Sequence, residues 1–197
     1  MNNLSIFCIT LNPEHVKLIR QLSYIPVGLG EKIFSEDCLS DKEGNNIADK
    51  NRNYGEYTFH YWIWKNYLDK IETEWVGFCQ YRKFWLIENY NGQINNFASL
   101  KEKLLKEIPE SFNEFEVILG EPLFINQFRF SKFIKRNLKT MIKNPSLFFN
   151  KNKRNIKFHF DMMHGNGNLD KAINLLNKDD RDDFRRFVNS EVSFNPH

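Results

Sequence analysis

Glu74-Trp-Val-Gly-Phe-Cys-Gln80 is a short, mostly apolar run, and Tyr81-Arg-Lys83 follows it directly. Its length and composition predict a central β-strand, with the tyrosine and the two cations leaving the strand's C-terminal end. Leu4-Ser-Ile-Phe-Cys-Ile-Thr10 is an earlier apolar run and predicts a buried strand. Tyr24-Ile-Pro-Val-Gly-Leu-Gly30 is another apolar stretch and ends in glycines. Gly28-Leu-Gly30 lacks a full dinucleotide or P-loop fingerprint, so a strand-ending turn is the favoured interpretation and a phosphate-cradling loop the alternative.

Helical patterns lie between these runs. Residues 41–53 are polar and predict a loop. Asn53 and Glu56 have the spacing of a capping box, which predicts the start of an aromatic helix that reaches Tyr67 and Leu68.

Further signals follow in the second half of the chain. Ser99 and Glu102 predict the start of an amphipathic helix that continues to Ile108 and stops before a proline. Residues 115–119 predict a strand, and residues 169–189 predict two charged helices. Strands that alternate with helices favour an α/β sheet.

The composition is that of an ordinary globular protein, with 41% hydrophobic and 27% charged residues among 197. It excludes a disordered, collagen-like or coiled-coil chain and fits one domain over residues 1–197, in which residues 126–160 are expected to be a basic helical insertion. The formal net charge of +3 is too small to argue by itself for nucleic acid as a partner. No apolar run approaches the roughly 20 residues that span a bilayer, and the N-terminus lacks a signal-peptide pattern, so we expect a cytoplasmic protein.

Metal and disulfide sites are not expected. The cysteines are odd in number and far apart, which fits reduced thiols: Cys8, Cys38 and Cys79. His159 and His164 are five residues apart, a spacing that points two helix side chains to different faces. The triplet Asp180-Arg-Asp182 resembles the Asp-x-Asp of metal-dependent transferases, but it lies in a charged helical run and favours a solvated helix face.

A basic and aromatic segment extends from residue 126 to residue 160. It contains ten lysines and arginines and no acid, with phenylalanines and isoleucines interleaved. Lysine head groups and inserted apolar side chains suit an anionic membrane surface, so Lys132 and Arg136 are candidate contacts to a membrane or an acceptor. Single-stranded nucleic acid and a solvated helical insertion are the alternatives, although no RNA-binding signature accompanies the segment.

Several short motifs occur in a fixed order between about residues 24 and 85. They resemble the DUF4422 family, whose pattern is G-D-N-I-S, K-N, Y-C-E-L-T, Y-W-W-K-N and G-L-C-H-Y-R-R-Y-F. A fixed order makes the set far more specific than any single motif. The matching residues are Gly44, Asn46, Ile47, Lys50, Asn51, Tyr54, Glu56, Thr58, Tyr61, Trp62, Trp64, Lys65, Asn66, Gly77, Cys79, Tyr81 and Arg82.

The resemblance implies a glycosyltransferase of capsular polysaccharide or O-antigen assembly. It implies a GT-A-like, Rossmann-like sheet that binds a nucleotide-sugar and is flanked by helices. We expect an inverting transfer of a hexose, galactofuranose in one branch of the family, from a UDP-linked donor to a surface polysaccharide or lipid-linked glycan. No cofactor is expected beyond this co-substrate, and the need for a divalent metal stays open. Such an enzyme would work as a peripheral protein on the inner face of the cytoplasmic membrane.

A nucleotide-sugar transferase must neutralise a diphosphate leaving group with a metal or with fixed cations. Arg82 and Lys83 leave a strand end and are the best-placed cations, with Lys65 as a third. The alternatives are a structural ion pair for Arg82 and a helix-dipole role for Lys65. Four further residues are expected to orient the donor: Asn46, Asn51, Gln80 and Tyr81. The two asparagines fit loop-stabilising Asx turns equally well.

An inverting transfer also needs a general base for the acceptor hydroxyl. The candidates are Glu56, Asp161, His164 and His197. Glu56 has its capping box as an alternative role, and His164 lies in a turn rich in glycine and asparagine, where an exposed histidine is often incidental. Trp62 is expected either to stack on the acceptor or to belong to the core, and His197 is a further acceptor candidate.

The sequence departs from the family pattern at several positions. Asn45 replaces an aspartate and Gln80 a histidine, and smaller changes are found at Ala48, Gly55 and Lys83. The family usually continues with an H-N-M-F-I motif where this chain ends, so the resemblance implies a shortened unit. A catalytically silent relative that binds a sugar or a nucleotide is therefore the main alternative function, and a single-stranded nucleic-acid binder the less favoured one.

Overall fold

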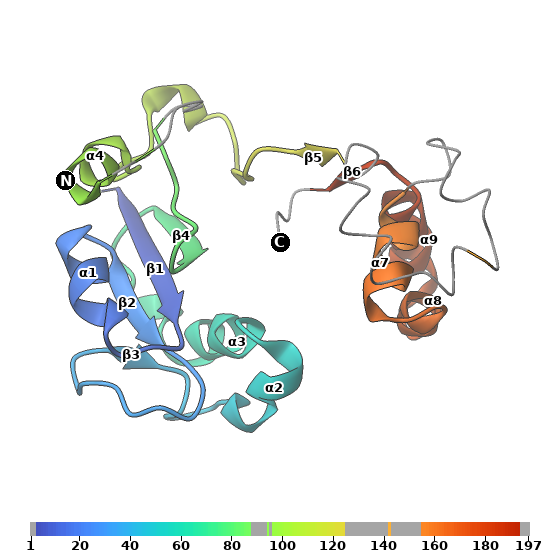
Figure 1. Ribbon diagram of the computed structural model, residues 1–197, viewed down its shortest axis with the longest axis horizontal. Helices are drawn as coiled ribbons and strands as arrows, with labels where there is room; N and C mark the ends of the chain where they lie inside the picture. The colour runs from blue at the N-terminus through green and yellow to red at the C-terminus, as the bar shows by residue number, and fades with distance from the viewer. Residues whose placement is uncertain (1–2, 88–93, 95, 125–141, 143–154, 194–197) are drawn as a thin grey trace. The chain divides into compact units, whose positions relative to one another are not determined.

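The computed structural model describes residues 3–87, 94, 96–124, 142 and 155–193 (Figure 1). The chain forms two compact units, residues 1–116 and 117–197. Each unit has its own secondary structure and its own buried cluster. A single domain over residues 1–197 stays a prediction.

The first unit contains a four-stranded parallel sheet. Its strands follow the order β3-β2-β1-β4 and are β1 (Leu4–Thr10), β2 (Ile25–Gly28), β3 (Leu39–Ser40) and β4 (Trp75–Gln80). The three apolar runs of the sequence therefore form strands, as predicted, and the structure shows that these strands are neighbours. A parallel sheet flanked by helices confirms the α/β class, and this strand order is compatible with a Rossmann-like fold.

One strand takes a different place from the one expected. Among the described strands, β4 ends the order rather than standing at its centre, and its residues are half-buried. β1 is central instead, because it pairs with β2 on one side and with β4 on the other. Its last five residues are buried.

Helices connect the strands of this sheet. Between β1 and β2 lies α1 (His15–Gln21), and the segment between β3 and β4 holds η1 (Ala48–Lys50), α2 (Asn51–Tyr54), α3 (Tyr57–Asn66) and η2 (Leu68–Lys70). After β4 come α4 (Phe97–Lys103) and η3 (Glu110–Phe112). α3 packs on the sheet, where Phe59 lies 5.7 Å from Phe7 of β1 between ring centroids. Phe7 in turn stacks on Phe78 of β4 at 5.9 Å.

The start of the aromatic helix differs from the capping-box expectation. Asn53 lies inside α2, and Glu56 takes the N-cap position of α3 without a capping bond from its side chain. Gly55 separates the two helices because its φ of +55° leaves the helical region.

α4 also differs from the helix expected from Ser99 to Ile108. Asn96 caps it instead, accepting the N–H of Ser99 at 2.8 Å. The helix ends at Lys103 because the next residues are extended and pair with the segment after β4: the N–H of Leu105 donates to the carbonyl of Trp85 at 2.9 Å. Tertiary pairing outweighs the helical pattern here.

Residues 115–119 do not form the expected strand. No strand of the described chain pairs with them, and the side chains of Phe115, Val117 and Leu119 are exposed. The segment has no neighbouring strand among the described residues, and an apolar pattern forms a strand only where it packs against neighbours.

The second unit contains three helices in its described part: α7 (Ile156–His164), α8 (Asn168–Ile173) and α9 (Lys178–Val188). β5 (Leu123–Phe124) pairs with β6 (Val192–Ser193) in antiparallel orientation. The two charged helices predicted within residues 169–189 are α8 and α9. Leu169, Ile173 and Val188 form the buried cluster of this unit.

Candidate functional site

The carboxyl ends of β1 and β4 form the sheet edge at which ligands bind in folds of this kind. The chain passes from β1 to β2 on one side, whereas β4 lies on the other side of β1 (Figure 1). In open α/β sheets, ligands bind outside the strand ends at such a switch point. β1 ends here at Thr10 and β4 at Gln80.

A tight turn follows β4 at this edge. The N–H of Lys83 donates to the carbonyl of Gln80 at 2.8 Å, and the N–H of Tyr81 donates to Ile9 of β1 at 2.8 Å. Arg82, third in the turn, has a φ of +77°. This is the pattern of a type II turn, whose third position favours glycine or asparagine. The left-handed conformation costs an arginine roughly 1–2 kcal/mol.

Two aromatic rings bridge the ends of β1 and β4. The rings of His15 and Tyr81 are stacked, with centroids 3.5 Å apart and planes inclined by 13°. His15 Nδ1 lies 2.8 Å from Thr10 Oγ1, which also accepts the N–H of Asn12 at 3.1 Å. Phe84 approaches Tyr81 edge-on at 6.1 Å. The turn is therefore fastened to β1 by backbone and side-chain contacts.

Arg82 and Lys83 are exposed beside this stack. Within the described residues no carboxylate forms an ion pair with Arg82, so the structural ion pair considered from the sequence is not found there. A guanidinium in this position can bind a phosphate bidentately from solvent.

The loop after β3 is fastened to α3 by residues of the family pattern. Asn66 accepts the N–H of Asn45 at 2.9 Å and donates to the carbonyl of Asn45 at 2.8 Å. Trp62 is 7% exposed and donates its indole N–H to the carbonyl of Glu43 at 2.8 Å. The Tyr61 hydroxyl donates to Asn45 Oδ1 at 3.1 Å. An aspartate at position 45 would accept the same bond, so this departure from the family preserves the contact.

Gly44 and Asn46 give the same loop its shape. Gly44 has a φ of +63°, and a Cβ there would lie 2.4 Å from Asn66 Oδ1, so only glycine fits. Asn46 Nδ2 donates to the carbonyls of Lys42 and Gly44, both at 3.0 Å, and its Oδ1 accepts the N–H of Ala48 at 3.2 Å. These bonds are those of a loop-stabilising asparagine, and the donor-binding role of Asn46 stays a prediction.

Two other residues predicted to bind the nucleotide-sugar, Asn51 and Lys65, contact side chains or carbonyls around α3. Asn51 Nδ2 donates to the carbonyl of Gly55 at 2.9 Å and to the hydroxyl of Thr58 at 3.1 Å. Lys65 Nζ lies 3.3 Å from the ring centroid of Trp64, a cation–π contact near the end of α3. Both contacts join residues of the α2–α3 segment itself.

Glu56 lies one helical turn before His60 on α3. Burial lowers the pKa of His60, and the negative charge of Glu56 opposes this shift only in part. The His60 ring packs on Phe78 at 4.3 Å, and its Nε2 is buried without a hydrogen-bond partner in the described part of the chain. His60 therefore favours its neutral form.

The thiols are free, as the sequence predicts, and Cys8 faces Cys79 across β1 and β4. Hydrogen bonding with Cys8, together with burial, raises the pKa of the Cys79 thiol far above its usual value. A thiol that stays protonated is a poor nucleophile, which disfavours Cys79 in that role.

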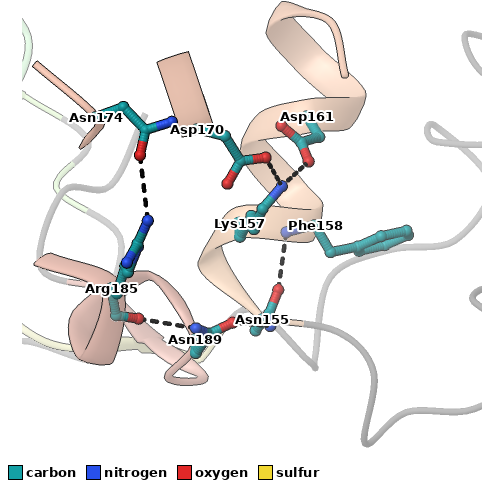
Figure 2. A network of polar contacts seen from close by, with 8 residues as sticks. All are labelled: Asn155, Lys157, Phe158, Asp161, Asp170, Asn174, Arg185 and Asn189. Carbon is teal, nitrogen blue, oxygen red and sulfur yellow. Dashed lines mark hydrogen bonds and ion pairs between the residues drawn. The ribbon is translucent and has the colours of Figure 1, made fainter. Parts of the chain in front are cut away.

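The base candidates Asp161 and His164 lie on α7 in the second unit. Figure 2 shows the Lys157 ammonium between two carboxylates, 2.5 Å from Asp161 and 2.9 Å from Asp170. Burial alone would lower the pKa of Lys157, but its hydrogen bonds to both carboxylates raise it. Asp161 Oδ1 is buried without a partner within the described residues, whereas His164 is exposed.

The contacts in Figure 2 also join α7, α8 and α9. Asn155 caps α7 by accepting the N–H of Phe158 at 2.8 Å, and its Nδ2 donates to Asn189 Oδ1 at 3.2 Å. Arg185 of α9 donates to Asn174 Oδ1, which follows α8, at 3.1 Å. The ion pairs of Lys157 thus belong to a network that holds the bundle together.

Lys132, Arg136 and His197 lie outside the described residues, as does most of the basic segment 126–160. In the part of the chain that the structure describes, no group of three or more histidine, cysteine, aspartate or glutamate side chains is arranged to hold a metal ion. No described helix has both the length and the apolar character needed to cross a bilayer.

The structure brings one group of predicted site residues together: Gln80, Tyr81, Arg82 and Lys83. The sequence reasoning missed Thr10 and His15, which meet this group from β1 and α1. Thr10 carried a signal, because it ends a predicted strand, whereas the spacing of His15 carried none.

Comparison with protein-family models gives one finding. The model described as a domain of unknown function, DUF4422, matches residues 8–191 and so spans both compact units. No curated protein and no solved structure matches the chain. The family match covers most of the sequence and includes all of β4 and the carboxyl end of β1 from Cys8 onward. The chain belongs to the DUF4422 family.

Proposed function

We propose that this chain is a glycosyltransferase whose nucleotide-sugar donor binds at the carboxyl ends of β1 and β4. The observation that carries the proposal is Arg82, an exposed arginine with left-handed backbone in the turn after β4. Strained residues cluster at ligand sites, because the surrounding structure must enforce a conformation that the residue itself disfavours. A guanidinium at a switch point suits the diphosphate of a UDP-linked sugar.

The proposed reaction is an inverting transfer of a hexose, with galactofuranose as one candidate. The acceptor hydroxyl attacks the anomeric carbon, the bond from that carbon to the diphosphate breaks, and the diphosphate leaves with the electron pair. Arg82 and Lys83 stabilise the charge that develops on the leaving group, and Tyr81 and Gln80 orient the donor. A carboxylate or an imidazole takes the acceptor proton, for which Glu56, Asp161 and His164 remain the candidates.

The acceptor in this proposal is a surface polysaccharide or a lipid-linked glycan at the inner face of the cytoplasmic membrane. Lys132 and Arg136 of the basic segment would contact the acceptor or the anionic lipid surface. Trp62 is largely buried and its N–H is bonded to the loop after β3, so only its remaining surface is open to a sugar. The family resemblance supports this part of the proposal.

A panel of nucleoside diphosphates and nucleotide-sugars tests the proposal. A ligand at about 100 times its dissociation constant should stabilise the protein by about 2.7 kcal/mol in thermal unfolding. Arg82→Ala should abolish the ligand-induced rise in melting temperature. Arg52→Ala, which removes an exposed arginine of α2, should leave this rise unchanged. Release of UDP from the bound donor on addition of a glycan acceptor measures transfer.

The outcomes separate the candidate functions. Binding with transfer supports the enzyme, and binding without transfer to any acceptor supports the catalytically silent relative. No binding of any nucleotide, or equal binding by Arg82→Ala, contradicts a donor site at this edge.

A further inference from the structure

The His15 imidazole is held in place from two directions. Its Nδ1 lies 2.8 Å from the Thr10 hydroxyl, and one of its faces is stacked on the Tyr81 ring at 3.5 Å. The first contact fixes the ring nitrogen that faces β1, and the second fixes the plane of the ring. A histidine oriented at one nitrogen by a neighbouring group is typical of sites where the other nitrogen acts on a ligand.

The second nitrogen of this ring has no hydrogen-bond partner in the part of the chain that the structure describes. Among the described residues, no side chain or carbonyl forms a hydrogen bond with His15 Nε2, and His15 is half-buried rather than part of the core. The single hydrogen of the Thr10 hydroxyl can go to Nδ1 at 2.8 Å or to the carbonyl of Asn12 at 3.3 Å. When it goes to Nδ1, the proton of the neutral ring is on Nε2. In the protonated imidazole both nitrogens carry protons, and Nε2 is again a donor. Nε2 can therefore donate a hydrogen bond in the protonated ring and in the neutral tautomer that accepts from Thr10.

Two cations follow the tyrosine on which the His15 ring is stacked. They are Arg82 and Lys83, which come directly after Tyr81 and are exposed. Glu14, the acid next to His15 in the chain, accepts a hydrogen bond from Asn12 Nδ2 at 3.1 Å. This bond orients the exposed Glu14 carboxylate without removing its charge, whereas Arg82 forms no ion pair with a carboxylate within the described residues.

We propose that His15 Nε2 donates a hydrogen bond to the diphosphate of the bound nucleotide, with Thr10 and Tyr81 holding the imidazole and Arg82 supplying positive charge. This inference rests on the proposed function and names a ligand contact at the same site. The stack of His15 on Tyr81 joins α1 to the turn after β4. One diphosphate group can therefore accept hydrogen bonds from residues on both sides of the switch point.

Two substitutions at one position test the contact. His15→Asn keeps an amide that can reach Thr10 but removes the group at the position of Nε2, whereas His15→Gln keeps a donor at that position. Binding of UDP and of inorganic pyrophosphate is measured by calorimetry. A lost hydrogen bond to a charged group weakens binding by about 10- to 100-fold, so His15→Asn should fall in that range and His15→Gln should stay within about threefold of the wild type.

A wild-type measurement keeps the test independent of folding defects. The Nε2 resonance of His15, observed by ¹⁵N NMR of the unaltered protein, should move when pyrophosphate or UDP binds. Lys17→Gln, which removes an exposed cation of α1, is the control for general loss of charge and should bind both ligands like the wild type.

Each outcome decides the inference. Binding of UDP that depends on His15 supports it. If pyrophosphate alone binds in this way, His15 contacts a free diphosphate, and both the nucleotide contact and the nucleotide-sugar function are overturned. UDP binding that is equal in wild type and His15→Asn, with no movement of the Nε2 resonance, overturns the inference and leaves the proposed function intact. Absence of binding by both ligands overturns both.

Discussion

Replacing Arg82 by glycine separates the role of the backbone at this position from the role of the side chain. With a φ of +77°, Arg82 adopts a conformation that costs a residue with a Cβ roughly 1–2 kcal/mol. Glycine removes this cost, but its greater conformational freedom in the unfolded chain lowers the free energy of unfolding by about 0.4–1 kcal/mol. The expected net gain in the free energy of unfolding is about 0.5–1 kcal/mol, or a few degrees in melting temperature for a chain of this size.

The same substitution should abolish nucleotide binding because it removes the guanidinium. Arg82→Ala should lose binding equally but gain no stability, because alanine keeps the Cβ. Ser23→Gly is the matched control: Ser23 has a φ of +66° after α1, away from the carboxyl ends of the strands. It should gain stability like Arg82→Gly and keep nucleotide binding.

Urea unfolding and calorimetric titration of the three variants measure both effects. A stability of Arg82→Gly below that of Arg82→Ala would refute the argument that the turn strains residue 82. Retained nucleotide binding by both variants would refute the functional reason given for that strain.

Three further predictions concern the loop after β3, His60 and the second unit. Asn66→Ala removes the hydrogen bonds to Asn45 and Trp62 and should lower the free energy of unfolding by roughly 1–3 kcal/mol in urea unfolding. Asn53→Ala, at an exposed position, is the control and should lower it by under about 0.5 kcal/mol. Equal effects of the two substitutions would contradict the role of Asn66 in holding the loop on α3. Because burial lowers the pKa of His60 below its usual 6.5, the unfolded chain binds this proton more readily, so stability should fall as the pH drops through about 6.5. His60→Leu should flatten that fall between about pH 7 and pH 5 in urea unfolding, and an unchanged pH dependence would count against it. Lys157→Met leaves the Asp161 and Asp170 carboxylates without their cation and should destabilise the α7–α9 bundle by roughly 1–3 kcal/mol, measured by hydrogen exchange. Lys171→Met, at an exposed position, is the control. Amides of the bundle that stay as protected in Lys157→Met as in the wild type would contradict the stabilising role of the network in Figure 2.

The sheet could be predicted from the sequence because its signals are local. Short apolar runs such as Leu4–Thr10 and Trp75–Gln80 must be buried, and buried runs of this length between helical patterns form parallel strands. The exceptions depended on distant partners. The segment after Lys103 is extended because it pairs with residues 85–87, and residues 115–119 have no such partner in the described chain.

The candidate site was predictable only in part for the same reason. Arg82 and Lys83 could be found because they follow a strand directly, and the switch-point rule gives such positions a meaning. His15 could not be found by spacing, because its contact with Tyr81 joins residues 66 positions apart and depends on β1 and β4 being neighbours. Conversely, much of the family pattern around Gly44, Trp62 and Asn66 holds a loop on a helix, a role that the residue types alone do not distinguish from ligand binding.

Mapping UDP binding by the backbone amide resonances of the full chain tests the central claim most directly. Donor binding at the switch point predicts that the largest chemical-shift changes fall on residues 10–15 and 80–83, with small changes over α8 and α9, and that Arg82→Ala removes them. Shifts concentrated on α8 and α9, or none at a saturating concentration of UDP or of a UDP-linked sugar, would contradict a donor site at the carboxyl ends of β1 and β4.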